Sequence, residues 1–190
     1  LKPLISVIAI GAISLSINID KNVLANDIAN ICEFDSTSKV TPDYSTMNCL
    51  LTETALSYDV PPEIVKAIAE GESGNWRHFN ENGEAIVTPD NGIGIMQVTN
   101  QAGLDQNKLK SDLLYNIEEG VKILDYMFTE RNDLPVINGG KREVLENWYF
   151  AIMAYNGIKP QNSPTFQATG ERNTEDYQEK ILRIMKDNSL

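Results

Sequence analysis

The sequence predicts a mainly α-helical single domain behind an N-terminal export segment. Apolar residues recur at three- and four-residue spacing through most of the chain after residue 44, as they do on the buried face of an α-helix. No long stretch alternates apolar and polar residues as a half-buried strand does, so we expect at most a very small β lip. With 190 residues and 42% hydrophobic content, the chain is long enough for one domain with its own core.

Residues 1–25 are typical of a secretory signal peptide. A basic start is followed by an apolar run over residues 4–19, and Ala25 provides a small side chain before expected cleavage at Asn26. The alternative is an uncleaved membrane anchor, but the run is shorter than the roughly 20 apolar residues that a membrane span requires. We therefore expect a secreted, extracytoplasmic protein with no stable membrane span after processing.

Residues 26–44 mix Asp, Ser, Thr and Pro and predict an irregular lead-in segment. The two cysteines of the chain, Cys32 and Cys49, are too few for a structural zinc site, even with the single histidine, so no metal site is predicted. In an exported protein a disulfide between them is favoured over two buried thiols. Such a bond would hold the lead-in segment against the domain.

Five helices are predicted within the domain, which we place at residues 45–190, from apolar spacing and capping residues. Ser111 is the expected N-cap of the third helix, and Gly120 inside that helix is expected to allow close packing against another helix. The stretch 148–155 carries no charge, which predicts a helix buried in the centre of the domain. The expected ranges are 45–58, 61–73, 111–131, 143–156 and 174–186.

The second of these helices places a carboxylate where a helix of a globular domain normally has core. Glu72 lies four residues after Ile68 and seven after Val65, so it shares their apolar face. Apolar neighbours and the negative end of the helix both disfavour the charged carboxylate and raise its pKa. A carboxylic acid that is still protonated near neutral pH suits general-acid cleavage of a glycosidic bond. The alternative is that the helix ends one turn earlier and Glu72 points into solvent.

Four short motifs follow one another along the chain, and their order and spacing resemble those of the soluble lytic transglycosylase domain. This lysozyme-like family cuts the glycan strands of bacterial peptidoglycan. The resemblance covers about residues 50–185. The second motif is one residue shorter than the family pattern when read from Gly92, and the spacing is restored if Asn91 replaces the first glycine. The motifs are Glu72-Ser73, Gly92-Ile93-Gly94-Ile95-Met96-Gln97, Asn116-Ile117-Glu118-Glu119-Gly120 and Ala154-Tyr155-Asn156.

The resemblance implies a lysozyme-like fold and a single catalytic acid, Glu72. This residue would protonate the oxygen between N-acetylmuramic acid and N-acetylglucosamine. It would then take a proton from the muramyl C6 hydroxyl, so that a 1,6-anhydro end forms. The hydroxyl of Tyr155 would approach Glu72, while Gln97 would bind substrate or shape the cleft. The residues expected to contact substrate or support the cleft are Ser73, Gly94, Met96, Gln97, Tyr155 and Asn156.

Two alternatives to a transglycosylase are open at this stage. A hydrolytic muramidase of the same fold needs a second carboxylate to position water, and Asp90 is the best-placed candidate, ahead of Glu84. A non-catalytic peptidoglycan-binding module is the other alternative. It is disfavoured because Glu72, Gln97 and Tyr155 are all intact.

The net charge of −11 argues against nucleic acid and anionic membrane surfaces as partners, because binding phosphates requires clustered Lys and Arg. No cofactor is implied, and the expected partner of this monomeric enzyme is the peptidoglycan glycan strand. Trp76 and Phe79 are expected either to stack on sugar rings or to cover the core. Trp148 is expected in the core and His78 at the surface.

Overall fold

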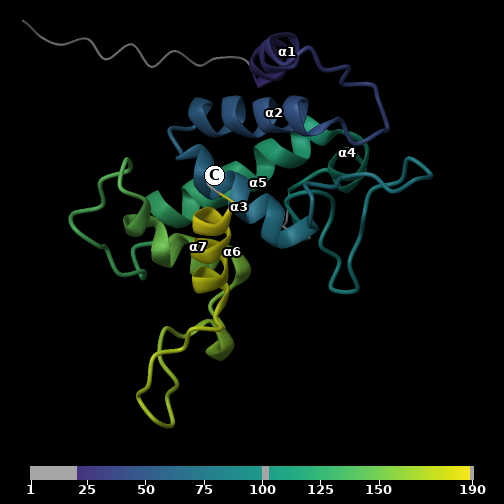
Figure 1. Ribbon diagram of the computed structural model, residues 1–190. Coiled ribbons are helices and arrows are strands. Elements are labelled where there is room, and N and C mark those ends of the chain that lie inside the picture. The colour runs from purple at the N-terminus through teal and green to yellow at the C-terminus, as the bar shows by residue number, and fades with distance from the viewer. Residues whose placement is uncertain (1–20, 100–102, 189–190) are drawn as a thin grey trace, which may run out of the picture.

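The computed structural model describes residues 21–99 and 103–188 (Figure 1). This part of the chain is mainly α-helical, which confirms the predicted fold class, and none of its helices has the length and apolar character needed to cross a bilayer. Residues 1–20 of the expected signal segment lie outside the described residues. The helices are α1 (Lys21–Ile31), α2 (Tyr44–Ser57), α3 (Pro62–Ser73), α4 (Gln106–Ser111), α5 (Leu113–Thr129), the 3-10 helix η1 (Leu145–Trp148), α6 (Tyr149–Asn156), the 3-10 helix η2 (Pro160–Asn162) and α7 (Tyr177–Asp187).

Helix α3 lies between α2 and α7, and the three helices together form the centre of the molecule (Figure 1). Pro62 occupies the first helical position of α3, where its missing N–H is not needed. Gly74 ends the helix with a φ of +59°, in the left-handed region that glycine adopts without strain. Helix α5 packs against α2 and α6, and Trp148 at the start of α6 is fully buried, as the sequence predicts.

Helix α1 is the largest difference from the predicted lead-in segment. Residues 26–31, expected to be irregular, form its second half, and α1 lies across α2 (Figure 1). Ile28 and Ala29 bury their side chains in the core, and a disulfide joins Cys32 to Cys49 of α2. Tertiary contacts of this kind order a segment whose composition alone favours a loop.

The helix predicted over residues 111–131 is interrupted near its start. Ser111 ends the short helix α4 instead of capping α5, and the cap of α5 is Asp112, whose carboxylate accepts a hydrogen bond from the backbone N–H of Tyr115 at 3.0 Å. Asp105 caps α4 in the same way. An aspartate is as good an N-cap as a serine, so the choice between neighbouring residues depends on the tertiary turn between the two helices.

The predicted β lip, between α3 and α4, consists of isolated bridges, and residues 85–88 form no continuous strand. Its last turn packs Met96 against Gly120 of α5, where an added Cβ would lie 2.6 Å from the Cβ of Met96. Gly120 therefore allows a loop, and not another helix, to approach α5. The bridges are Phe79–Ala85, Val87–Ile93 and Ile93–Val98.

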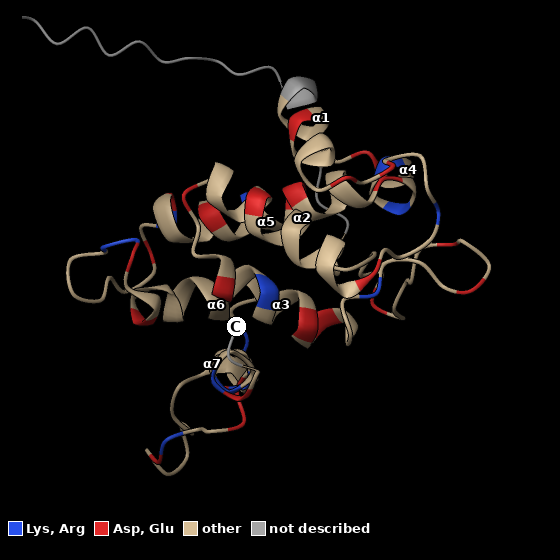
Figure 2. Ribbon diagram, turned by 45° about the horizontal axis from the view of Figure 1, so that its top comes forward, with Lys and Arg blue, Asp and Glu red and all other residues tan. Residues whose placement is uncertain are grey.

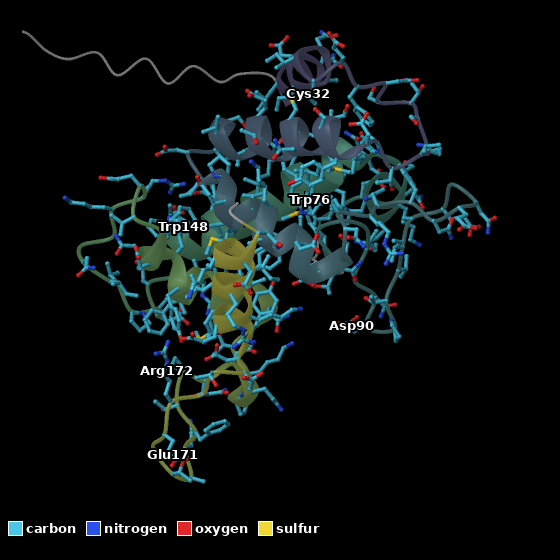
Figure 3. The ribbon with its side chains drawn as sticks, viewed as in Figure 1. Cys32, Trp76, Asp90, Trp148, Glu171 and Arg172 are labelled. Carbon is cyan, nitrogen blue, oxygen red and sulfur yellow. A yellow bond between two sulfur atoms is a disulfide. The ribbon has the colours of Figure 1, made fainter. Side chains whose placement is uncertain are left out.

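A hairpin projects from the domain between α6 and α7, and Figure 3 labels Glu171 and Arg172 within it. Thr165 pairs with Arg172 across this hairpin. Helix α7 begins after it at the N-cap Asp176 and packs along α3. Acidic residues are spread over several helices and loops of the described part (Figure 2).

We expect Gly120→Ala to lower the free energy of unfolding by about 1–2 kcal/mol, because overpacking against Met96 exceeds the gain in helix propensity. Gly71→Ala in α3 is the matched control. Its added Cβ would meet the terminal Cδ1 atoms of Ile181 and Ile184, which can move, so the loss should be smaller. Urea unfolding followed by circular dichroism measures both. Equal stability of Gly120→Ala and the wild type would contradict the close packing of this loop on α5.

Candidate active site

Glu72 lies in the last turn of α3, half-buried, and Oε1 accepts a hydrogen bond of 2.5 Å from the hydroxyl of Tyr177 in α7. The alternative in which the helix ends before Glu72 is wrong, because α3 continues to Ser73. Burial raises the pKa of Glu72 above its ordinary value, and this effect outweighs the hydrogen bond from Tyr177 and the positive charge of Lys180. The site therefore contains a carboxyl group that keeps its proton to a higher pH than an exposed glutamate does.

Tyr177 is a residue of this site that the sequence analysis did not single out, although it lies in the helix predicted over residues 174–186. The available signal is its chemistry: a tyrosine on the inward face of an amphipathic helix brings a hydroxyl that needs a hydrogen-bond partner. Burial, followed by the negative charge of Glu72, raises the pKa of Tyr177 well above its usual range. The phenol is thus a permanent hydrogen-bond donor to Glu72.

Tyr155, near the end of α6, was expected to bring its hydroxyl to Glu72. Its hydroxyl donates a hydrogen bond of 2.7 Å to the backbone carbonyl of Met96. Burial is the main cause that raises the pKa of Tyr155, and the charge of Glu72 adds to it. Tyr155 therefore links α6 to the loop that carries Met96 and Gln97, while Tyr177 contacts the acid.

The loop over residues 91–97 has the backbone conformation that its glycine motif predicts. Asn91 has a φ of +66°, in the left-handed region, so it occupies a position that suits glycine. Gly94 has a φ of +70°, and an added Cβ there would overlap the ring of His78 and the amide of Asn116. Two constraints, the backbone angle and the close approach, therefore require glycine at this position.

Gln97 uses both polar atoms of its side chain within the loop. Its Nε2 donates to the carbonyl of Gly94 at 2.8 Å, and its Oε1 lies 2.7 Å from the hydroxyl of Thr88. The same hydroxyl lies 2.6 Å from Oδ1 of Asp90, and its single proton serves one of the two acceptors at a time. Gln97 therefore shapes the loop and connects it to Asp90.

Asn116 anchors the loop from α5, and its side chain is fully buried. Its Oδ1 accepts from the backbone N–H of Met96 at 3.1 Å, and its Nδ2 donates to the carbonyl of Ile93 at 2.9 Å. Nδ2 also donates to the carbonyl of Leu109 at 3.2 Å. One amide thus satisfies backbone groups that would be paired in a sheet, which explains why the third motif begins with asparagine.

His78 is completely buried, so the prediction of a surface histidine is wrong. Its Nδ1 accepts from the backbone N–H of Ile95 at 3.2 Å, so the ring proton is on Nε2, which lies 3.3 Å from the carbonyl of Lys110. Burial is the main cause that lowers the pKa of His78 to about 4. The neutral ring therefore joins α4 to the loop.

Two other predicted site residues make local contacts. Ser73 is buried, and its hydroxyl donates to the carbonyl of Ala69 at 2.8 Å, one turn earlier in α3. Asn156 accepts a hydrogen bond at Oδ1 from Nδ2 of Asn162 at 3.0 Å. Both residues complete the ends of their helices and leave Glu72 with Tyr177 as its hydrogen-bonded partner among the described residues.

Asp90 lies on an exposed loop of the lip, away from the core (Figure 3). The hydrogen bond from Thr88 is the main cause that lowers the pKa of its carboxyl, so Asp90 is ionised at neutral pH. Its negative charge adds to the rise in the pKa of Glu72. Within residues 21–99 and 103–188, no three or more side chains of His, Cys, Asp and Glu are grouped to hold a metal ion.

A protein-family model described as Transglycosylase SLT domain matches residues 50–178, more than half of the chain. The matched range includes Glu72, the loop over residues 91–97, Asn116 and Tyr155, and it extends into α7 as far as Tyr177 and Gln178. Searches among curated proteins and among solved structures return no match.

We expect Tyr177→Phe to raise the pKa of Glu72, because the hydrogen bond that stabilises the ionised carboxylate is lost. A ¹³C NMR titration of the glutamate carboxyl carbons measures this pKa directly. The matched control is Tyr155→Phe, which removes a hydroxyl that donates to Met96 instead, so its effect on Glu72 should be smaller. A pKa of Glu72 that falls, or that moves equally in both variants, would contradict the assignment.

We expect the free energy of unfolding to decrease as the pH falls from about 6.5 to about 4. The unfolded imidazole takes up a proton near 6.5, whereas His78 in the folded protein resists protonation until about 4, so acid favours the unfolded state by about 3 kcal/mol in total. Urea unfolding between pH 7 and pH 5 tests this, since most carboxylates are already ionised there. His78→Gln should flatten the slope; an unchanged slope would show that His78 is not its source.

Proposed function

The chain belongs to the transglycosylase SLT family, whose members cleave peptidoglycan as lytic transglycosylases, and we propose that Glu72 is its catalytic acid. The proposed bond is the β-1,4 linkage between N-acetylmuramic acid and N-acetylglucosamine, and the proposed product is a 1,6-anhydromuramyl end. The observation that carries this proposal is the half-buried carboxyl of Glu72, with a raised pKa and a phenol on one of its two oxygens. A general acid requires this combination of protonation and fixed orientation.

In the first proposed step the proton of Glu72 passes to the glycosidic oxygen. The bond between this oxygen and C1 of the muramyl residue then breaks, and the N-acetylglucosamine leaves with a free 4-hydroxyl group. Because Tyr177 donates to Oε1, the other oxygen of Glu72, Oε2, is the one that exchanges the proton. The same phenol stabilises the carboxylate that the transfer leaves behind.

In the second proposed step the Glu72 carboxylate removes the proton from the C6 hydroxyl of the muramyl residue. The C6 oxygen bonds to C1 and closes the 1,6-anhydro ring, and Glu72 returns to its protonated form. No water is consumed, so one residue serves as acid and then as base. The negative charge of Asp90 supports the return of the proton, because it raises the pKa of Glu72.

A muramidase of the same family fold is the second candidate, and it is favoured by one observation. Asp90 is an ionised carboxylate on the lip, and its charge acts on Glu72. In that case Asp90 would hold the attacking water, and the product would carry a reducing end. A wall enzyme of either kind acts outside the cytoplasmic membrane, where the Cys32–Cys49 disulfide is stable.

We expect the protein to release muropeptides from purified peptidoglycan that are one water lighter than the corresponding reducing-end species. Mass spectrometry of the soluble products measures this difference. Glu72→Gln should lower the rate of release by about 100-fold or more, because it removes the general acid.

Asp90→Asn is the matched control, since it removes a charge on the lip without touching the proposed acid. We expect this variant to form the same anhydro product. The pKa on the alkaline side of its pH–rate profile should be lower, because a charge that raises the pKa of Glu72 is lost. If the wild type forms products with reducing ends and Asp90→Asn does not, the reaction is hydrolysis instead. Release by Glu72→Gln at the wild-type rate would remove Glu72 as the acid.

A further inference from the structure

A cavity of about 420 Å³ lies beside the C-terminal half of α3, and Glu72 does not line it. Glu70 lines this cavity, and it is two residues before Glu72 on the same helix. At 3.6 residues per turn, two positions are separated by roughly 200° around the helix axis. The cavity is therefore on the side of α3 that faces away from the proposed catalytic acid.

One wall of the cavity is a pair of stacked aromatic rings. Tyr44, at the start of α2, stacks on Trp76 with ring centroids 4.7 Å apart and an interplanar angle of 10°. Trp76 is 4% exposed and its indole N–H donates to the carbonyl of Lys66 at 3.0 Å, so it is a fixed base for the pair. Tyr44 is 68% exposed, which leaves its other ring face open to solvent.

The chain adopts unfavourable backbone angles to build this wall. Asn75 and Trp76 both lie in the left-handed region, with φ angles of +54° and +50°, and neither is glycine. Trp76 follows the end of α3, and Figure 3 labels it between α2 and α3. Strained residues of this kind are common at binding sites, where they hold a side chain in a required position.

The rest of the cavity is lined by Pro42 and Met47 and by three polar side chains. The polar groups are the carboxylate of Glu70 and the amides of Asn75 and Asn188. Asn75 and Asn188 are exposed and Glu70 is partly exposed, so all three polar groups are accessible from solvent. The cavity therefore offers a flat aromatic face together with acceptors and donors that a ligand can use.

We propose that this cavity is a second binding site for an N-acetylated amino sugar of the glycan strand, separate from the site at Glu72. A pyranose ring has one apolar face of C–H groups, which fits the open face of Tyr44, and a rim of hydroxyl and amide groups. The hydroxyl groups donate to Glu70, and the acetamido group pairs with an asparagine amide, which both donates and accepts. A cationic amine would use the carboxylate and the ring face but would leave the amide donors without a partner.

This inference rests on the proposed function, since it gives the proposed enzyme a second contact with the same polymer. Two sites on opposite sides of α3 cannot hold adjacent sugars of one straight segment. The second site therefore keeps the enzyme on the wall by binding another strand or a distant part of the same strand. Binding at two linked sites raises the effective concentration of the polymer at Glu72 without a new contact there.

The two tryptophans of the chain provide a direct test. A ¹⁵N HSQC titration of the ¹⁵N-labelled Glu72→Gln protein with N,N′-diacetylchitobiose follows both indole N–H signals. We expect the signal of Trp76 to shift and that of Trp148 to stay unchanged, because Trp148 is fully buried and donates to the carbonyl of Arg142 elsewhere in the domain. A Trp76 signal that does not move at saturating disaccharide overturns the proposal.

Variants in the same background identify the groups that bind. Tyr44→Ala should raise the dissociation constant, measured from the Trp76 shift, about tenfold, because the stacking face is lost. Tyr44→Phe keeps an aromatic face and should restore most of the affinity. Tyr126→Ala is the matched control, since it removes another exposed tyrosine, on α5, and should have no effect. Equal affinity of Tyr44→Ala and its parent overturns the proposal.

Glu70→Gln separates a sugar from an amine as the ligand. The glutamine still accepts hydrogen bonds from hydroxyl groups, so affinity for the disaccharide should change by less than about threefold, whereas a cation site would lose its charge partner. The contrary result has two parts: n-butylammonium shifts the Trp76 signal and Glu70→Gln abolishes that shift, while the disaccharide causes no shift. This result overturns the proposal in favour of an amine site.

Product analysis of the wild-type protein distinguishes failure of the second sugar site from failure of the proposed reaction. Anhydro products with no Trp76 shift would overturn only the second site and leave the proposed reaction in place. A Trp76 shift that depends on Tyr44, in a protein that releases no products, would support the sugar site and overturn the proposed reaction.

Discussion

The amount of water that reaches the carboxyl of Glu72 is the constraint on which the candidate site depends. An exposed glutamate at the end of a helix is ionised at neutral pH and cannot donate a proton. Here α7 packs along α3, and one phenol contacts the carboxyl where several water molecules would otherwise be bound. The single hydrogen bond favours the ionised form, but the loss of solvent favours the neutral form more strongly.

The loop beside Glu72 is held by buried polar side chains in place of a sheet. Isolated bridges pair only a few of its backbone groups, so the remaining N–H and C=O groups need other partners. Asn116 and His78 supply them from α5 and from the lip itself. Because both side chains are buried and fully used, a change at either position would leave backbone groups unpaired in the interior.

The sequence was sufficient to predict the helical fold, the placement of Glu72 on an apolar face and the motifs around it. These features depend on local spacing, which one sequence displays directly. It was not sufficient for Tyr177, because an inward tyrosine looks the same whether its hydroxyl meets a carboxylate or a backbone carbonyl. His78 was misjudged for a related reason: polar neighbours in the chain suggest a surface position, whereas the loop folds back and buries the ring. Contacts between distant segments decide both cases.

The hydrogen bond between Tyr177 and Glu72 joins residues 105 positions apart, so the site is complete only when α7 is packed against α3. Bringing the ends of such a large loop together costs conformational entropy, which the packing of α7 on α3 must offset. Until α7 docks, Glu72 is an ordinary ionised glutamate at the end of a helix. A chain that is still being synthesised and lacks α7 therefore carries Glu72 without the phenol of Tyr177.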